Sequence, residues 1–302
     1  MAPVRALLAL IIVLGHFSFY GVPELEPLRN LAPASVSLFL FISGYGLIKS
    51  LRAKGSVYLQ HFFQRRIFIV ALPALLVTAI HLFLGGGSGI DILTRGRLIL
   101  THGETLLPHY WFVWAILFDY LAFWLSAKLL PEKLQKYAIL LLTIVFTAAT
   151  YMAGFDRCWW VCSLAFATGT FFAEYESRVF SFCGKTEFHY WLILLVLGLA
   201  FCAFYMTRNP LIWTLCYIFI PLIGALLIAR LPLDKFKLPI LRFIGIISYE
   251  LYLIHIPVMS FLHGDKVYLE SPALYIAAVL ALSLALAFGI NRLKLLYLTK
   301  TT

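Results

Sequence analysis

Arg5 and His16 are the residues near the start of the chain whose types and spacing could support chemistry. They are the only ionisable side chains in residues 4–16, which are otherwise apolar. In an α-helix their separation corresponds to roughly 20° beyond three full turns and ~16 Å along the axis, so both side chains lie on one face. An ionisable residue inside a membrane span is costly and marks a functional site by default. An Arg at the rim and a His at depth predict a charged co-substrate that enters from one side.

Considered separately, each residue has a simpler explanation. Arg5 could be an anchor that reaches the lipid headgroups, and His16 could make a hydrogen bond that holds two helices together. Their common helix face favours a functional pair.

The composition of the whole chain indicates a membrane protein. Of its 302 residues, 62% are hydrophobic and 13% are charged, whereas soluble domains average about 25% charged residues. Long apolar runs recur from end to end, so the sequence predicts an all-α, polytopic integral membrane bundle. We expect a single domain over residues 1–302, with no appended soluble domain.

About ten transmembrane helices are predicted. Their expected ranges are 4–20, 33–50, 62–84, 110–130, 137–153, 158–175, 188–206, 210–230, 241–262 and 272–291. The first resembles a signal peptide, but no small-residue cleavage site follows it, so we expect it to be retained.

The distribution of Lys and Arg predicts the orientation. If the ten helices alternate in direction, most of the 24 Lys and Arg residues fall on one side, which is therefore cytoplasmic, together with both termini. Basic loops beside an anionic membrane also explain the net charge of +10 without a nucleic-acid partner. Arg5 then lies at the cytoplasmic end of the first helix, and His16 lies about half of the ~30 Å hydrocarbon thickness inward.

Further polar residues occur within the predicted helices. Arg65 and Arg66 open the third helix, and because adjacent residues cannot share a face, we expect one to face the headgroups and the other the bundle. The inward guanidinium would suit a phosphate group, although topology alone could also explain the pair. Asp119 in the fourth helix needs a partner if it is buried.

The ninth predicted helix carries a polar face. Ser248, Tyr252 and His255 are spaced by four and three residues and so share that face, while Glu250 points elsewhere. This pattern predicts one wall of a polar pocket. The five cysteines do not form a zinc-binding pattern, so no metal site is predicted.

Several segments together resemble the membrane acyltransferase-3 family. Their features are the Arg and His of the first helix, a segment similar to a Phe-Phe-x-x-Ser-Gly-Phe helix, a basic helix start followed by Pro, an aromatic fourth helix, and a segment similar to Ser-Tyr-x-Leu-Tyr-Leu-x-His-x-Pro. In that order these segments are residues 4–16, 36–45, 62–73, 109–114 and 247–257. The resemblance covers residues 4–259.

The resemblance implies an integral membrane O-acyltransferase. Such an enzyme moves an acyl group, usually acetyl, from cytoplasmic acyl-CoA to a hydroxyl of a glycan or lipid-linked sugar. Acyl-CoA is then a co-substrate, and no permanently bound cofactor is expected. We expect the bacterial inner membrane as the location. A monomer and a homo-oligomer both remain open.

The resemblance also implies roles for individual residues. His16 is expected to be catalytic together with Arg5, and Arg5, Arg65 and Arg66 are expected to contact the phosphates of CoA. Ser43 and Tyr45 are expected to contribute to binding of the donor. The remaining expected residues form a substrate pocket: Trp111, Asp119, Ser248, Tyr249, Tyr252 and His255.

One departure from the family pattern affects the donor site. The family usually has a further Arg three residues before the Pro of the third helix, where this chain has Val70. That phosphate contact is therefore either lost or replaced, and Lys54 and Arg242 are the candidate replacements. Some members also carry an extracytoplasmic hydrolase-like domain, so here either the helical part completes the transfer or a partner does.

A mechanism follows from these residues as a hypothesis. Acyl-CoA would dock with its phosphates on Arg5 and on Arg65 or Arg66, and the pantetheine arm would place the thioester near His16. That His could be a general base on the acceptor hydroxyl or could take the acyl group itself.

Other classes of protein stay open as alternatives. A proton-coupled transporter would also use His, Arg and Asp at depth, although no inverted repeat is evident. A non-catalytic membrane scaffold would not need Arg5 and His16 on one face. For an acyltransferase, the acceptor could also be a lipid, a peptide or a small metabolite.

Overall fold

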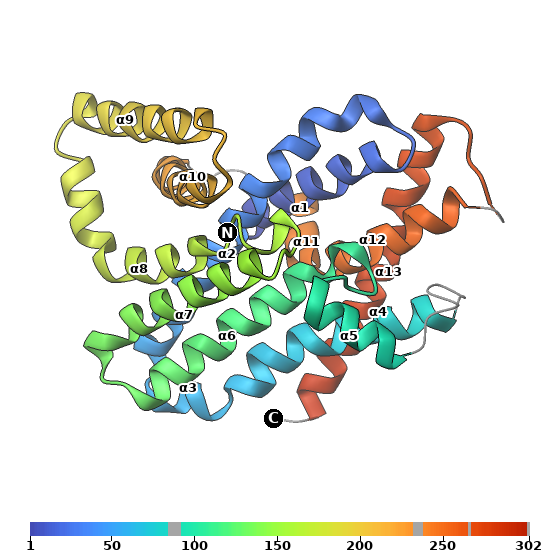
Figure 1. Ribbon diagram of the computed structural model, residues 1–302, viewed down its shortest axis with the longest axis horizontal. Coiled ribbons are helices and arrows are strands. Elements are labelled where there is room, and N and C mark those ends of the chain that lie inside the picture. Colours follow the sequence, from blue (N-terminus) through green and yellow to red (C-terminus); the bar gives the residue numbers. More distant parts are fainter. Residues whose placement is uncertain (84–91, 232–237, 265–266, 301–302) are drawn as a thin grey trace.

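The protein is a bundle of helices (Figure 1). The computed structural model describes residues 1–83, 92–231, 238–264 and 267–300, and these contain no strand beyond an isolated bridge between His263 and Tyr268. The α-helices are α1 (Ala2–His16), α2 (Glu26–Lys54), α3 (Ser56–Gln60), α4 (Phe68–Phe83), α5 (Ile92–His102), α6 (Trp111–Leu129), α7 (Glu132–Met152), α8 (Leu164–Cys183), α9 (Glu187–Met206), α10 (Pro210–Arg230), α11 (Pro239–Ile246), α12 (Ser248–Leu262) and α13 (Pro272–Lys300). Short helical turns join them: η1 (Phe17–Phe19), η2 (Pro23–Leu25), η3 (Phe63–Ile67), η4 (Pro108–Tyr110) and η5 (Arg157–Trp159).

The predicted all-α membrane bundle is confirmed, but the predicted number of ten spans is not. Among the described residues, eight helices are long and apolar enough to cross a membrane, or nine if α11 and α12 form one broken span. The predicted span 158–175 overlaps η5 and α8. Every stretch of α8 long enough to cross a membrane contains Glu174, Glu176 and Arg178. Because of these three charged residues, α8 is not one of the eight apolar helices.

The long helix α2 is the central packing element of the bundle. It packs most extensively against α8 and α1. Close approach to α8 depends on two glycines, because a Cβ on Gly44 would lie 2.2 Å from the Phe166 carbonyl oxygen and one on Gly169 would lie 2.1 Å from that of Phe41. Small residues at such contacts allow two helix backbones to touch. Away from this contact, α9 packs mainly on α10 at one corner of the molecule (Figure 1).

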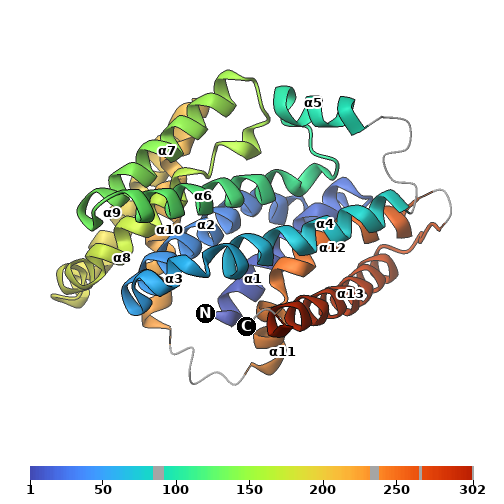
Figure 2. The same cartoon turned by 90° about the horizontal axis from the view of Figure 1, so that it is seen from below.

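A sharp bend between α11 and α12 brings the chain around the start of α1. The two helices meet at 77°, and Figure 2 shows α11 beside the N-terminal end of α1. A Cβ on Gly245 would lie 1.8 Å from the Ala2 carbonyl oxygen. This backbone contact fixes the first turn of α1, and therefore Arg5, next to α11 and α12.

Candidate active site

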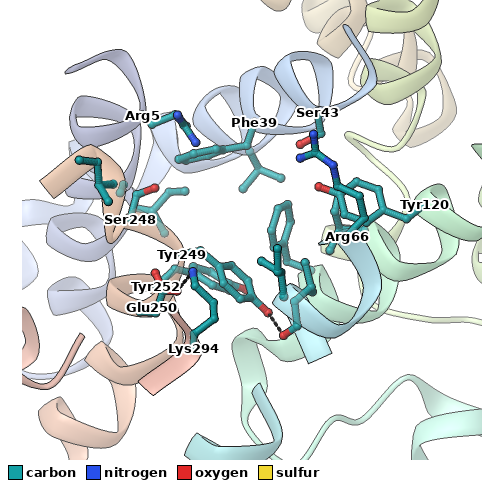
Figure 3. Close-up of a pocket in the computed structure, with 18 residues that line it drawn as sticks. Arg5, Phe39, Ser43, Arg66, Tyr120, Ser248, Tyr249, Glu250, Tyr252 and Lys294 are labelled. Atoms are coloured by element: carbon teal, nitrogen blue, oxygen red, sulfur yellow. Dashed lines mark hydrogen bonds and ion pairs between the residues drawn. The ribbon is translucent and has the colours of Figure 1, made fainter. Parts of the chain in front are cut away.

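A cavity of about 220 Å³ opens between α1, α2, α4, α6 and the α11–α13 segment (Figure 3). Four charged side chains line it, and they come from four different elements: Arg5, Arg66, Glu250 and Lys294. The other side chains in its wall are mostly aliphatic or aromatic. The cavity therefore combines a cationic part with an apolar part.

Arg5 and Arg66 reach the cavity from different helices. Arg5 is exposed on the first turn of α1, and its side chain makes no hydrogen bond or ion pair within the part of the chain that the structure describes. The Arg66 Nε–H donates to the hydroxyl of Tyr58 at 2.8 Å, which holds the guanidinium toward the cavity. Figure 3 shows the two arginines on opposite sides of the cavity, with Phe39 between them.

The adjacent arginines of η3 face different surroundings. Arg66 lines the cavity and is partly buried, whereas Arg65 is exposed and does not line it. Of the two guanidinium groups, only that of Arg66 faces the cavity.

His16 and His255 contact each other where α1 and α12 pack together. Their rings stack with centroids 5.0 Å apart, and His16 Nδ1 lies 2.7 Å from His255 Nε2. His255 Nδ1 lies 3.2 Å from the Leu251 carbonyl oxygen. Since a carbonyl oxygen only accepts, His255 Nδ1 carries the proton, and in a neutral ring its Nε2 is then an acceptor. His16 Nδ1 therefore donates, which leaves the lone pair of His16 Nε2 free.

A third histidine adjoins this pair and was not assigned to the site from the sequence. The His109 ring lies 5.2 Å from the His255 ring, and its Nε2 donates to the Leu253 carbonyl oxygen at 3.2 Å. His109 is buried, and its Nδ1 has no hydrogen-bond partner among the described residues. Its position directly after Pro108, at the start of the aromatic fourth helix, is the signal that could have identified it.

The cavity ends about one helical turn short of the histidines. Ile12 and Tyr252 line its inner part, but His16, His109 and His255 do not. Tyr252 lies between the two regions: its hydroxyl donates to the His109 carbonyl oxygen, and its ring centroid is 5.9 Å from that of His255.

The remaining predicted site residues divide into two groups. Ser43, Ser248, Tyr249 and Tyr252 line the cavity. The others do not, and they are Tyr45, Trp111 and Asp119.

Each residue outside the cavity has another environment. The Tyr45 hydroxyl donates to Glu176 at 2.8 Å, across the interface between α2 and α8. Trp111 packs against Phe112. Asp119 is buried but forms no ion pair with any described residue. The charged partner that we expected for its carboxylate is therefore not found among those residues.

The lining of the cavity bears on two expectations about charged residues. Glu250 lines the cavity, although its spacing placed it on another face, because the cavity curves around the first turn of α12. Lys54 and Arg242 do not line the cavity, so their contact with a phosphate stays a prediction. Lys294 from α13 lines it instead.

The described residues contain no cluster of three or more His, Cys, Asp or Glu side chains that could hold a metal ion.

Together, the fold and the site define a helical membrane protein in which a cationic cavity leads toward the His16–His255 pair. The sequence model of the acyltransferase-3 family, described as an acyltransferase domain, matches residues 4–292. The chain belongs to this family and is a membrane acyltransferase. No curated protein and no solved structure matches it.

Proposed function

We propose that this protein transfers an acyl group, most simply acetyl, from acyl-CoA to a hydroxyl of a glycan or lipid-linked sugar. One observation carries the proposal. Arg5 and Arg66, which have no carboxylate partner among the described residues, line a cavity that ends one helical turn before a histidine with a free ring nitrogen.

The shape and charge of the cavity suit an acyl-CoA that enters from the cytoplasm. Guanidinium groups bind phosphate through paired N–H donors, so Arg5 and Arg66 would hold the phosphates of CoA. The apolar wall formed by Ile12, Phe39 and Phe112 would enclose the pantetheine arm. This arrangement directs the thioester along α1 toward His16.

His16 would act as the general base. Its Nε2 takes the proton of the acceptor hydroxyl while the hydroxyl oxygen attacks the thioester carbonyl. The carbon–sulfur bond then breaks, and the departing CoA thiolate receives the proton from His16. The hydrogen bond from His16 Nδ1 to His255 Nε2 holds the ring and supports the positive charge that it carries during the step.

The same lone pair also supports a two-step route. In that route His16 Nε2 attacks the thioester carbonyl, the carbon–sulfur bond breaks, and CoA leaves as the thiolate. The acceptor hydroxyl oxygen then attacks the acyl carbon, the carbon–nitrogen bond to His16 breaks, and the hydroxyl proton passes to the CoA thiolate. A protein incubated with acyl-CoA alone would then carry one acyl group on His16, which mass spectrometry would detect.

The closed inner end of the cavity implies movement during the reaction. Tyr252 and Ile12 separate the cavity from His16, so their side chains must shift before the thioester can reach the ring nitrogen. We propose that the acceptor approaches His16 from the extracytoplasmic side of the bacterial inner membrane, with both termini in the cytoplasm.

A transfer assay tests the function. Purified protein in detergent would be given acetyl-CoA and candidate glycan or lipid-linked acceptors, and release of free CoA thiol would be measured. We expect acceptor-dependent release by the wild-type protein and by His189→Ala, a variant on the distant helix α9. Release that is equally fast with His16→Ala would overturn the proposal.

A further inference from the structure

A third cation faces the cavity from the last helix. Lys294 lines the cavity together with Arg5 and Arg66, and its Nζ donates to Oε1 of Glu250. The Asn291 Nδ2 donates to the same oxygen at 3.2 Å. Figure 3 shows Lys294 and Glu250 on the side of the cavity opposite Arg66.

The arrangement holds Lys294 inward rather than toward the headgroups. Its side chain is 12% exposed and that of Glu250 is fully buried. Arg292, two residues earlier on α13, is exposed and lies over the Phe288 ring at 5.0 Å. A lysine that only anchors the helix would extend to water as Arg292 does.

Both members of the pair keep unused hydrogen-bonding capacity. An ammonium group has three N–H donors, and the contact with Glu250 uses one. Glu250 Oε2 is buried, has no partner among the described residues, and belongs to a side chain in the cavity wall. A buried carboxylate oxygen without a partner is unfavourable, so this oxygen can accept an N–H or O–H group of a ligand.

We propose that Lys294 is a third phosphate-binding residue of the acyl-donor site and that Glu250 positions it. This inference rests on the proposed function, in which the ligand is acyl-CoA. Asn291 holds Glu250, and Glu250 holds the ammonium at the cavity wall. The two remaining N–H groups of the ammonium donate to a phosphate of the donor. Glu250 Oε2 accepts from a hydroxyl or amide of the same molecule.

The first experiment compares acetyl-CoA affinity among variants in detergent, by calorimetric titration. A hydrogen bond to a charged group lost on substitution corresponds to a loss of roughly tenfold or more in affinity. We expect that loss for Lys294→Met, little change for Lys294→Arg, and none for Arg292→Met. Wild-type affinity in a folded Lys294→Met protein would overturn the proposal.

A second variant guards against misfolding, since Lys294→Met leaves a buried carboxylate unpaired. The double variant Lys294→Met/Glu250→Gln removes both charges and leaves the net charge of the cavity unchanged. We expect the double variant to fold and to lose as much acetyl-CoA affinity as Lys294→Met. It lacks the contact between Lys294 and the phosphate, although the net charge of the cavity is unchanged.

A third probe identifies the part of the donor that Lys294 contacts. S-acetylpantetheine lacks the phosphates of CoA, so the Lys294→Met variant, which keeps Glu250, should bind it as the wild type does. An equal loss for both probes would overturn a phosphate contact.

The outcomes separate this inference from the function on which it rests. If Arg66→Met weakens acetyl-CoA binding and the Lys294 variants do not, the role of Lys294 is wrong while the donor site stands. If the wild type does not bind acetyl-CoA, both are wrong.

Discussion

Two groups of cations predicted to lie on the cytoplasmic side have different surroundings. On the α2–α7–α8 side, Lys49 pairs with Glu176 at 2.6 Å and Lys136 pairs with Glu174 at 2.5 Å. Around the cavity, the Arg5 and Arg66 side chains pair with no carboxylate among the described residues.

This difference separates two uses of positive charge that counting Lys and Arg cannot distinguish. A cation already paired with a carboxylate stabilises the contact between its helices, whereas an unpaired cation at a cavity keeps its charge for an anionic ligand. Lys294 combines both features, because it is paired and also faces the cavity. The comparison predicts that substitutions on the two sides affect different properties.

The largest effect on acyl transfer is expected for a substitution of His16, which lies beyond the inner end of the cavity. His16→Ala removes the proposed base, so acyl transfer should fall by about 10²–10⁴-fold while acetyl-CoA still binds. Turnover and affinity would be measured on the same preparation. Wild-type turnover would show that the cavity does not serve a reaction at His16.

The next effect is expected at the cavity cations. Arg66→Met should weaken acetyl-CoA binding by roughly 10–100-fold, because it removes a charge-assisted contact to phosphate. Arg65→Met is the matched control, since it removes the same charge one residue away and outside the cavity. Equal losses for both variants in a binding titration would indicate a general effect of charge and erase the distinction between paired and unpaired cations.

Gly245→Ala tests whether the backbone contact with α1 sets the cavity. The added Cβ would overlap the Ala2 carbonyl oxygen and displace the turn that carries Arg5. We expect a loss of about 1–3 kcal/mol in stability, with weaker donor binding. Gly289→Ala on α13 has open space around it and should change neither property in thermal unfolding and binding assays.

Lys136→Met addresses the paired group. Its side chain is 7% exposed, and the substitution leaves Glu174 without its shortest ion pair, so stability should fall by about 1–2 kcal/mol. Donor affinity should not change. Lys49→Met removes a more exposed pair, with an expected effect of only about 0–1 kcal/mol. A large loss of acetyl-CoA affinity in either variant would contradict the division into two groups.

The sequence predicted those parts of the site that depend on a single helix. The offset between Arg5 and His16 placed a cation near the start of α1 and a histidine farther along the same helix. Ser43 and Tyr45 show the limit of a motif, because positions two apart on a helix face nearly opposite directions. Ser43 faces the cavity and Tyr45 faces α8.

Contacts between distant segments could not be derived from spacing. His16 and His255 meet only because α1 packs on α12, and Lys294 reaches the cavity only because α13 packs on α12. The apolar character of residues 241–262 predicted one helix, but hydrophobicity does not report the 77° bend between α11 and α12. The helical structure of residues 241–262 was thus predictable from the sequence. The break between α11 and α12 and the packing of α1, α12 and α13 depended on tertiary contacts.

Binding of acetyl-CoA to purified protein tests the central claim most directly. The wild type would be titrated beside Arg5→Ala and His16→Ala, after each is shown to be folded. We predict that the wild type and His16→Ala bind and that Arg5→Ala binds more weakly. A folded wild-type protein that does not bind acetyl-CoA would contradict the account and favour a transporter.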